Sequence, residues 1–548
     1  MSRWLLSGHN PQETLGISYP LSASYIADFT SRQQMEYVLK SLAGGTDHFD
    51  FSMPLIPRVG GLLYSNVNYC LRNIASVFPF DPASIGVPKG LVTSEHKPPL
   101  TTLLLLPFRF WRLYRRATHN LRTVLPRFRE TLDEIYWQLR DANPDHLTAR
   151  DLALIDRLFE PAMLDCMTAY ANALLVIGLP NISVLQWVND KAPALRNLLV
   201  GHGTNTAQLG ERIWELRQVA MQCGPPVVQA LRQGADLDAY RALPEAAPFL
   251  ERLTHFLHTY GHRAFHYASE FEATRLVDQP QLVLLAIAGL LEEGEAPAVR
   301  AHNARKASLR ALQEMPPLRR LFWRQLLKWG GALIEGREEN RNTMELQNAT
   351  YGLAARLLSQ HYFQSPDHLW LYQFDEFLAF GQSQGKIRVD VEVIARRRAE
   401  LAQDRRQTTP PELIWYDPET KEWWPVDGEQ PGPSTAVRLQ GIGVSAGSGP
   451  VEGVALVTNS AQEAAERLLD ISGPVVLVTH MTDPVWSSLF PRLTAVVTEM
   501  GGAISHAAIV ARENGLPAVV AAAEATGRIR DGQRVRVDGA AGSVEVIG

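Results

Sequence analysis

Cysteine is scarce in this sequence, with three residues among 548: Cys70, Cys166 and Cys223. Their number is odd and they lie far apart, so they offer neither a disulfide framework nor the close spacing of metal-binding cysteines. Structural disulfides are typical of secreted proteins, and the lack of a disulfide framework favours a reducing compartment. We therefore expect a cytoplasmic protein.

Long hydrophobic runs are also missing. The most apolar stretch, Leu100–Phe108, is far shorter than the ~20 residues that a membrane-spanning helix needs. The N-terminal segment Met1–His9 has only three consecutive apolar residues, too few for a secretory signal peptide. These absences predict a soluble protein.

Neither sign of charge is in large excess. The formal net charge is −5, from 53 Lys and Arg against 58 Asp and Glu, so we expect neither nucleic acid nor a membrane as a partner. Hydrophobic residues make up 46% and charged residues 20% of the chain, the balance of an ordinary globular protein. A chain of 548 residues is too long for one hydrophobic core, which predicts two or more domains.

Helical periodicity dominates residues 108–399. One amphipathic helix is indicated by the i, i+3, i+4, i+7 spacing of Leu132, Ile135, Tyr136 and Leu139. Thr148 followed by Asp151 resembles a capping box that opens the next helix. The first hundred residues are richer in Pro, Gly and Ser, and we expect irregular or short-strand structure there.

The composition changes after residue 401. Residues 402–436 contain six prolines and few aliphatic side chains, which indicates a semi-rigid linker, although its aromatic residues favour a hairpin turning at Pro418-Glu-Thr. Beyond this segment the sequence predicts five strands: Val475–Thr479, Ala495–Thr498, Ala518–Val520, Arg534–Val537 and Ser543–Ile547. The expected fold class is therefore multidomain, with a large, mainly α-helical domain over 1–401, the linker over 402–436 and a small α/β domain over 437–548.

One short segment of the small domain combines several features of a phosphate site. Gly501 and Gly502 allow a turn with positive φ, Ser505 is a candidate N-cap, and His506 then falls in the first helical turn. Amide groups and the dipole at a helix N-terminus favour a phosphoryl group there, and a neutral imidazole is nucleophilic near pH 7. From spacing alone, a histidine that merely caps the helix remains an equal alternative.

The same segment closely resembles the swivelling phosphohistidine domain of the phosphoenolpyruvate-utilising enzymes. The likeness covers Thr498-Glu-Met-Gly-Gly, Ser505-His506, Ala508-Ile509, Ala511-Arg512 and Gly515-Leu-Pro517, and it extends upstream to His480-Met-Thr-Asp-Pro. This resemblance implies that His506 carries a phosphoryl group between two distant sites. It also implies that Thr498 contacts the phosphorylated imidazole and that Arg512 helps to fix the helix, although Arg512 in a surface salt bridge is the alternative.

The first four hundred residues resemble, through shorter motifs, the substrate-binding domain of the rifampin phosphotransferase family. The motifs include Tyr260-Gly-His-Arg263, Glu270-Phe-Glu272 and Gly336-Arg-Glu338. This resemblance makes His262, Arg263, His266, Glu270, Glu272 and Arg337 candidate substrate-binding residues. The family often has a second glycine after the arginine, where this chain has Ala264-Phe-His-Tyr, so a different substrate pocket is expected.

Four histidines, His255, His258, His262 and His266, raise a separate question. On a continuous helix they would lie within about 80° of one another, and zinc favours such nitrogen ligands. Gly261 interrupts the helix and no cysteine accompanies the set, so we predict no metal site. A general base or substrate-binding role for His262 or His266 and ordinary surface or core histidines both remain open.

The family's dikinases take phosphate from an ATP-grasp domain or from a phosphoenolpyruvate-binding barrel, and the sequence shows neither. It also has no Gly-rich phosphate loop of the Walker kind. We therefore expect a split enzyme of the phenylphosphate synthase type, in which a separate ATP-grasp protein binds ATP and Mg²⁺ and this chain binds no cofactor itself. The acceptor would be a hydroxylated small molecule. A non-catalytic ligand-binding or regulatory protein, and a protein-to-protein phosphorelay component, are the alternatives.

Overall fold

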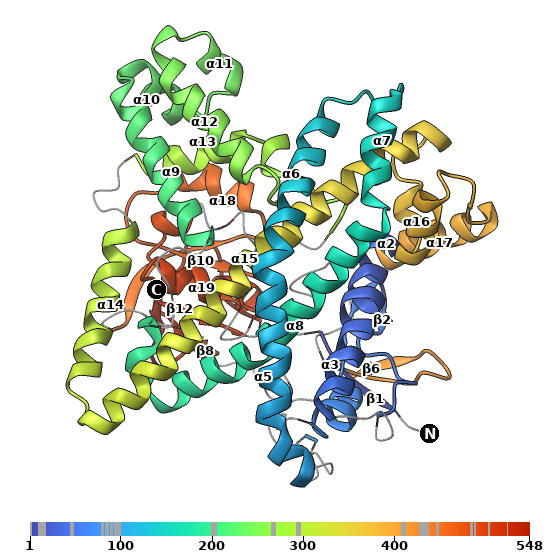
Figure 1. Ribbon diagram of the computed structural model, residues 1–548. Coiled ribbons are helices and arrows are strands. Elements are labelled where there is room, and N and C mark those ends of the chain that lie inside the picture. The colour runs from blue at the N-terminus through green and yellow to red at the C-terminus, as the bar shows by residue number, and fades with distance from the viewer. Residues whose placement is uncertain are drawn as a thin grey trace. The chain divides into compact units, whose positions relative to one another are not determined.

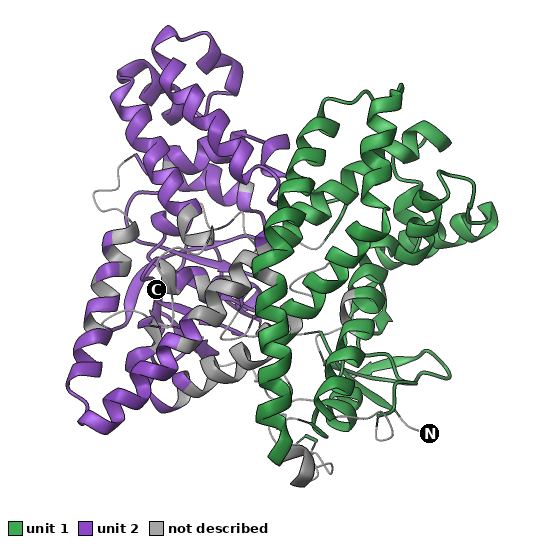
Figure 2. Ribbon diagram, viewed as in Figure 1, with its two compact units in different colours: residues 1–179, 267–273, 343–429 green, residues 180–266, 274–342, 430–548 purple. Residues whose placement is uncertain are grey.

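The computed structural model describes residues 3–8, 18–43, 49–77, 82, 87, 91–92, 100–198, 205–264, 270–291, 297–406, 413–426, 438–444, 449–482, 486, 489–501, 505–522 and 524–547. The chain forms two compact units that interleave along the sequence (Figure 2). Unit 1 comprises residues 1–179, 267–273 and 343–429, and unit 2 comprises residues 180–266, 274–342 and 430–548. The domain boundaries expected from the sequence stay a prediction.

Unit 1 contains a small antiparallel sheet with the order β4-β1-β5-β6. Its strands are β1 (Trp4–Ser7), β4 (Ser65–Asn66), β5 (Leu413–Tyr416) and β6 (Trp423–Pro425). The hairpin of β5 and β6 pairs Tyr416 with Trp423 across the turn, which confirms the hairpin expected there. Part of the predicted linker thus belongs to a sheet with the N-terminal strand, whereas residues 407–412 and 427–436 lie outside the described part of the chain.

The expectation of irregular structure in the first hundred residues is wrong for the segment Pro20–Ala43. It forms α2 (Pro20–Ser24), the π-helix η1 (Tyr25–Gln33) and α3 (Gln34–Ala43) without interruption. Further short elements follow: β2 (Arg58–Val59), β3 (Leu62–Leu63), α4 (Val67–Tyr69) and η2 (Cys70–Ile74).

The helices of unit 1 follow the sequence expectations more closely. In α6 (Leu125–Arg140) the four predicted apolar residues are buried. Thr148 caps α7 (Ala149–Leu158): its hydroxyl accepts a hydrogen bond from the Asp151 amide at 3.2 Å, and the Asp151 carboxylate accepts one from the Thr148 amide at 2.8 Å. The other elements of this region are α5 (Leu100–Thr123), α8 (Pro161–Lys191), α15 (Pro317–Phe363), η7 (Leu369–Leu371), α16 (Phe374–Gln382) and α17 (Val391–Asp404). Helices α8 and α15 each contain residues of both units.

Unit 2 contains a mixed sheet of eight strands in the order β7-β14-β13-β9-β10-β11-β12-β8. Its strands are β7 (Arg438–Gln440), β8 (Ile442–Gly443), β9 (Val451–Val457), β10 (Val475–Thr479), β11 (Ala495–Thr498), β12 (Ala518–Val520), β13 (Arg534–Asp538) and β14 (Ser543–Val546). Strands β9 to β12 run parallel and the outer pairs are antiparallel. All five predicted strands are therefore confirmed. Three helices lie between strands of this sheet in the sequence: α18 (Ala461–Leu468), α19 (His506–Glu513) and α20 (Ala525–Arg528).

Both faces of this sheet are buried. Along β10, Val475 and Leu477 belong to one hydrophobic cluster, while Val476 and Val478 belong to another. Because side chains alternate along a strand, this division shows that apolar groups cover the sheet on two sides. A continuous apolar run such as Val475–Val478 is typical of such strands.

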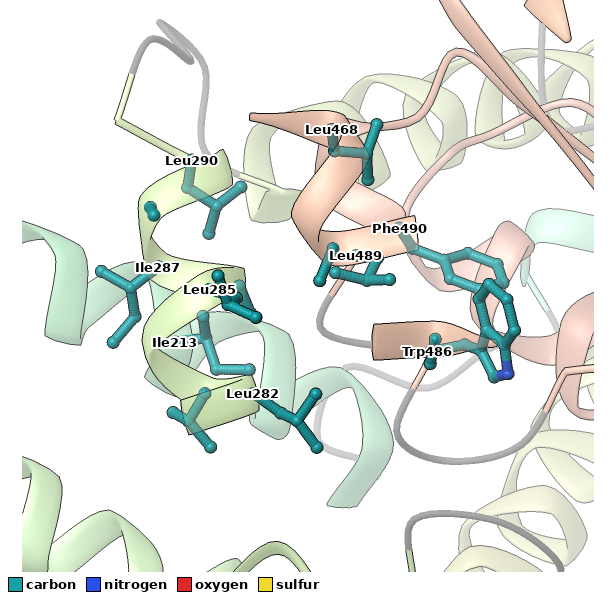
Figure 3. Packing of buried hydrophobic residues seen from close by; sticks show 14 of the residues in the cluster. Ile213, Leu282, Leu285, Ile287, Leu290, Leu468, Trp486, Leu489 and Phe490 are labelled. Carbon is teal, nitrogen blue, oxygen red and sulfur yellow. The ribbon is translucent and has the colours of Figure 1, made fainter. Parts of the chain in front are cut away.

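The first of these clusters extends into a group of helices that precedes the sheet in sequence. These helices are α9 (Asn205–Gln222), α10 (Pro225–Arg232), α11 (Leu237–Arg241), η5 (Pro244–Ala246), α12 (Ala247–Tyr260), η6 (Leu276–Asp278) and α13 (Gln281–Gly289). Figure 3 shows Leu285 of α13, and Leu290 just after this helix, facing Leu468 of α18 and Leu489. Two further elements, η4 (Pro193–Leu198) and α14 (Pro297–Gln313), contact each other. The α9–α13 helices and the C-terminal sheet thus share one hydrophobic core (Figure 1).

Among the described helices, none combines the length and the apolar composition that crossing a membrane requires.

Candidate functional site

The connection from β11 to α19 carries the residues that the sequence singles out. Thr498, the last residue of β11, is fully buried, and its hydroxyl donates a hydrogen bond to the Met500 carbonyl at 2.6 Å. The Thr498 carbonyl accepts the Ala522 amide at 2.9 Å. Thr498 therefore fixes the point at which the chain leaves the sheet.

The chain then turns toward the helix. Gly501 has a φ of +117°, which a residue with a β-carbon adopts only with strain. The Ser505 hydroxyl accepts a hydrogen bond from the Ala508 amide at 3.3 Å, the contact that an N-cap residue makes with the third residue of its helix. Helix α19 accordingly starts at His506. Gly502 and the side chains of His506 and Arg512 lie outside the described residues.

Packing holds this helix in place. Ala507, Ala508, Val510 and Ala511 are buried in the hydrophobic cluster that the α9–α13 helices share. At the other end, Gly515 has a φ of +66° and the Leu516 amide donates to the Ala511 carbonyl at 2.7 Å. Because the first backbone N–H groups of a helix have no partner within it, a rigid α19 offers donors to an anion beside residue 506.

A second group of polar side chains lies at the same edge of the sheet. His480 directly follows β10 and Glu499 directly follows β11, its parallel neighbour. The two side chains form a hydrogen bond of 2.7 Å between the His480 Nδ1 and a Glu499 carboxylate oxygen. The other carboxylate oxygen accepts the Thr526 amide at 2.7 Å and the Thr526 hydroxyl at 2.6 Å.

These contacts keep Glu499 ionised. Burial alone would raise its pKa, but the hydrogen bonds from His480 and Thr526 outweigh burial and hold the pKa below the ordinary value. The Asn459 side chain accepts the His480 amide at 2.7 Å and so fixes the backbone of that residue. The His480 side chain is 47% exposed, which leaves it accessible to a molecule at this edge of the sheet.

The sequence analysis did not single out His480 and Glu499 as a pair. The signal that could have found them is their position, one residue past each of two buried, neighbouring strands. The carboxyl ends of parallel strands lie together at one edge of a sheet, which is a frequent place for binding sites.

The candidate substrate residues His262 and Arg263 lie in the interior of unit 2. Their exposed fractions are 2% and 1%. The His262 Nε2 is 3.1 Å from the Asn342 side-chain oxygen, and the Arg263 carbonyl accepts the Leu276 amide at 2.9 Å. The His262 side chain therefore contacts α15, and the Arg263 backbone is hydrogen-bonded to η6.

Glu270 and Glu272 belong to unit 1. Glu272 lies in a turn, and Glu270 directly precedes that turn. Glu272 accepts hydrogen bonds from the Tyr19 amide at 3.2 Å and from the Ser22 hydroxyl at 2.8 Å, and so binds the start of α2. The substrate candidates are thus divided between the two units, and their role in substrate binding stays a prediction.

The structure describes the remaining candidate residues only in part. Helix α12 ends at Tyr260, next to Gly261, where the sequence predicted an interruption, so His255 and His258 are helical and His262 lies beyond the helix. His266 and the Arg337 side chain lie outside the described residues. Within the part of the chain that the structure describes, no group of three or more His, Cys, Asp or Glu residues is placed to hold a metal ion.

Comparison with known protein families supports the resemblances drawn from the motifs. Residues 471–542 match the family described as "PEP-utilising enzyme, mobile domain", and residues 165–338 match the "Rifampicin phosphotransferase fourth domain". The mobile-domain match includes β10, β11 and α19 and therefore the whole turn around residue 506. The resemblance to these enzymes is thereby confirmed.

Several curated proteins are similar to parts of the chain. A rifampicin phosphotransferase of a Streptomyces species is 39% identical over 177 residues, which are 32% of this chain and 18% of that protein. The rifampicin phosphotransferase of Bacillus subtilis is 36% identical over 163 residues, 29% of this chain and 17% of its own length. The phosphoenolpyruvate synthase of Aeropyrum pernix is 39% identical over 134 residues, 24% of this chain and 16% of that protein. The aligned segments thus make up less than a fifth of each relative.

Proposed function

We propose that the chain is the phosphocarrier and acceptor-binding subunit of an ATP-dependent, dikinase-like phosphotransferase. In this proposal, His506 accepts a phosphoryl group and passes it to the hydroxyl group of a small molecule. The coarser activity, a phosphotransferase of the phosphoenolpyruvate-utilising type, is supported by the matched families and by relatives that are named phosphotransferases.

The observation that carries the proposal is the turn between β11 and α19. Thr498 and Ser505 each make a short-range hydrogen bond that fixes one end of the turn, and Gly501 supplies the positive φ between them. The result is a helix that begins at a histidine. A histidine in the first turn of a helix can attack a phosphorus atom, and the dipole at the helix N-terminus stabilises its phosphorylated form.

Transfer takes two steps in this proposal. First, an imidazole nitrogen of His506 forms a bond to phosphorus, by family analogy the β-phosphorus of ATP, while the bond from that phosphorus to the oxygen of the departing AMP breaks. Water then releases the γ-phosphate as inorganic phosphate, which leaves a single phosphoryl group on His506. Second, the acceptor's hydroxyl oxygen bonds to the phosphorus, the nitrogen–phosphorus bond breaks, and a base takes the hydroxyl proton. Such reactions pass through a loose transition state, so the protein contributes mainly positioning and charge stabilisation.

Roles in the second step are assigned by family analogy to the substrate candidates. Arg263 and Arg337 would bind phosphoryl oxygens, because a guanidinium group matches two of them at once. His262, or one of Glu270 and Glu272, would take the acceptor's proton. His266 would line the same pocket. The small domain is proposed to swivel between the donor and this pocket, a motion that requires its contact with the α9–α13 helices to open.

A separate ATP-grasp protein is proposed to bind ATP and Mg²⁺ and to load His506. Incubation of the purified chain with β-labelled ATP, alone and with extract of its native cells, tests this assignment. The proposal predicts label on the chain only when extract is present, followed by transfer of that label to a small organic molecule. Label without extract would contradict the separate donor, and label that moves only to a second protein would contradict the small-molecule acceptor.

A further inference from the structure

Helix α5 of unit 1 has two apolar faces, and only one of them is buried. Leu113 and Ala117 are 7% and 5% exposed and pack in a hydrophobic cluster with residues of α3. On the other side, four large apolar side chains are exposed: Leu104 by 71%, Leu105 by 46%, Phe108 by 63% and Trp111 by 51%. At 100° per residue, these four lie within an arc of about 120°. We call these residues, with Arg112, Arg115 and Arg122, the α5 face.

The three arginines continue the same arc toward the C-terminal end of the helix. They are exposed, and the Arg115 guanidinium lies 4.8 Å from the centre of the Trp111 ring. Between Leu100 and Arg129 the sequence has seven arginines and neither aspartate nor glutamate. The chain as a whole carries a net charge of −5, whereas this segment is strongly positive. The net charge of the chain therefore does not reveal this local excess of arginine.

The charge decides which partner fits this surface. A second copy of the chain, docked face to face, would bring arginines against arginines, and like charges at close range oppose such contact. An anionic lipid surface accepts both features, because Trp, Phe and Leu insert at the boundary of the headgroups and Arg pairs with the phosphates. A lipid surface can bind an exposed helix face without a groove.

We propose that the α5 face docks the protein peripherally on an anionic lipid surface. The exposed apolar side chains enter the interface, and the arginines bind the lipid phosphates. This inference revises the expectation that no membrane is a partner, which rested on the net charge alone. It is independent of the proposed phosphotransfer.

Sedimentation of the full chain with phospholipid vesicles tests the proposal. We expect binding to vesicles of phosphatidylglycerol and phosphatidylcholine, weak or no binding to phosphatidylcholine alone, and a loss of binding as salt is raised. Equal binding to both kinds of vesicle, or binding to neither, would overturn the proposal.

Two variants separate the charge from the apolar contact. Arg112→Gln with Arg115→Gln should weaken binding about thirtyfold, since each arginine near an anionic surface contributes about 1 kcal/mol. Phe108→Ser with Trp111→Ser should weaken it about tenfold or more by removing inserted side chains. All four side chains are exposed, so the fold is expected to survive, and circular dichroism checks that it does.

The control is Arg252→Gln with Arg438→Gln, two exposed arginines outside α5, which changes the net charge by the same amount and should leave binding unchanged. An equal loss in the control would contradict a localised face. Two further results together would contradict the lipid proposal. They are complete displacement of the vesicles by polyglutamate, and vesicle binding by the Phe108→Ser, Trp111→Ser variant that equals binding by the unaltered chain. In that case the α5 face recognises an acidic protein.

Discussion

At Glu499, the charge of a side chain and the stability of the fold are linked. Its carboxylate accepts hydrogen bonds from His480 and Thr526, and these hold its pKa below the ordinary value in the folded protein. A carboxylate whose pKa is depressed on folding stabilises the protein above its unfolded pKa. That stabilisation is lost as the pH falls through the folded pKa.

The Glu499→Gln variant tests this linkage. At neutral pH it should have a lower melting temperature than the unaltered chain, because the amide offers His480 no negative charge. The difference should shrink as the pH is lowered below the ordinary carboxylate value of about 4.3. Glu251→Gln, at an exposed position of α12, is the control. A difference in melting temperature that stays constant down to acid pH would show that the carboxylate charge is not the cause.

At the residue scale, the sequence predicts local turns and caps better than contacts between distant residues. The motif around residue 506 stands out because Gly, Ser and His at these spacings have local, additive consequences. The His480–Glu499 pair escaped notice because it depends on which strands are neighbours. The sequence likewise did not predict that His262 and Arg263 are buried. Arginine and histidine side chains are more often exposed, and only tertiary packing shows which of them are exceptions.

At the scale of the elements, the N-cap of α19 gives a direct test. Ser505→Ala removes the hydroxyl that accepts the Ala508 amide, and loss of an N-cap costs about 0.5–2 kcal/mol. The variant should speed amide hydrogen exchange at Ala508 and its neighbours, whereas Ser505→Thr should retain most of the protection. Unchanged exchange in Ser505→Ala would contradict the cap.

Five of the eight strands in the sheet of unit 2, β10 to β14, were predicted almost to the residue because they are short apolar or alternating runs between turn residues. The helical segment Pro20–Ala43 was missed for a physical reason. Its middle third, η1, is a π-helix with a polar sequence, and such a helix does not follow the 3.6-residue period on which helix prediction rests. Among the described side chains of this segment, the buried apolar ones are Leu21, Ala23, Tyr25, Met35, Val38, Leu39 and Leu42.

At the scale of the whole molecule, the sequence did not anticipate that the α9–α13 helices share a core with the C-terminal sheet. The reason lies in α13, where every residue from Leu282 to Ala288 is buried. A helix that is apolar all round must be covered on more than one side. Here α9 and α10 pack on it together with α18, which follows it by about 170 residues in sequence, and periodicity within one segment cannot identify so distant a neighbour.

This shared core predicts that damage in α13 reaches the sheet. Leu285→Ala removes a side chain that is 5% exposed and should cost about 2–5 kcal/mol. Hydrogen exchange should then rise in both the α9–α13 helices and α18. Leu318→Ala, at a side chain that is 85% exposed, should have little effect. Increased exchange confined to the helices, with α18 unaffected, would argue against a common core.

The central claim is that His506 carries the phosphoryl group, and the most direct test is to locate the label on the protein. The chain is loaded from β-labelled ATP with extract of its native cells, with a known dikinase as the positive control, and the acid-labile phosphate is mapped by mass spectrometry. We predict the label at His506, its complete loss in His506→Ala, and full labelling in His255→Ala, which alters an exposed helical histidine. Label that persists in His506→Ala, or none on the unaltered chain while the dikinase is labelled, would contradict the account.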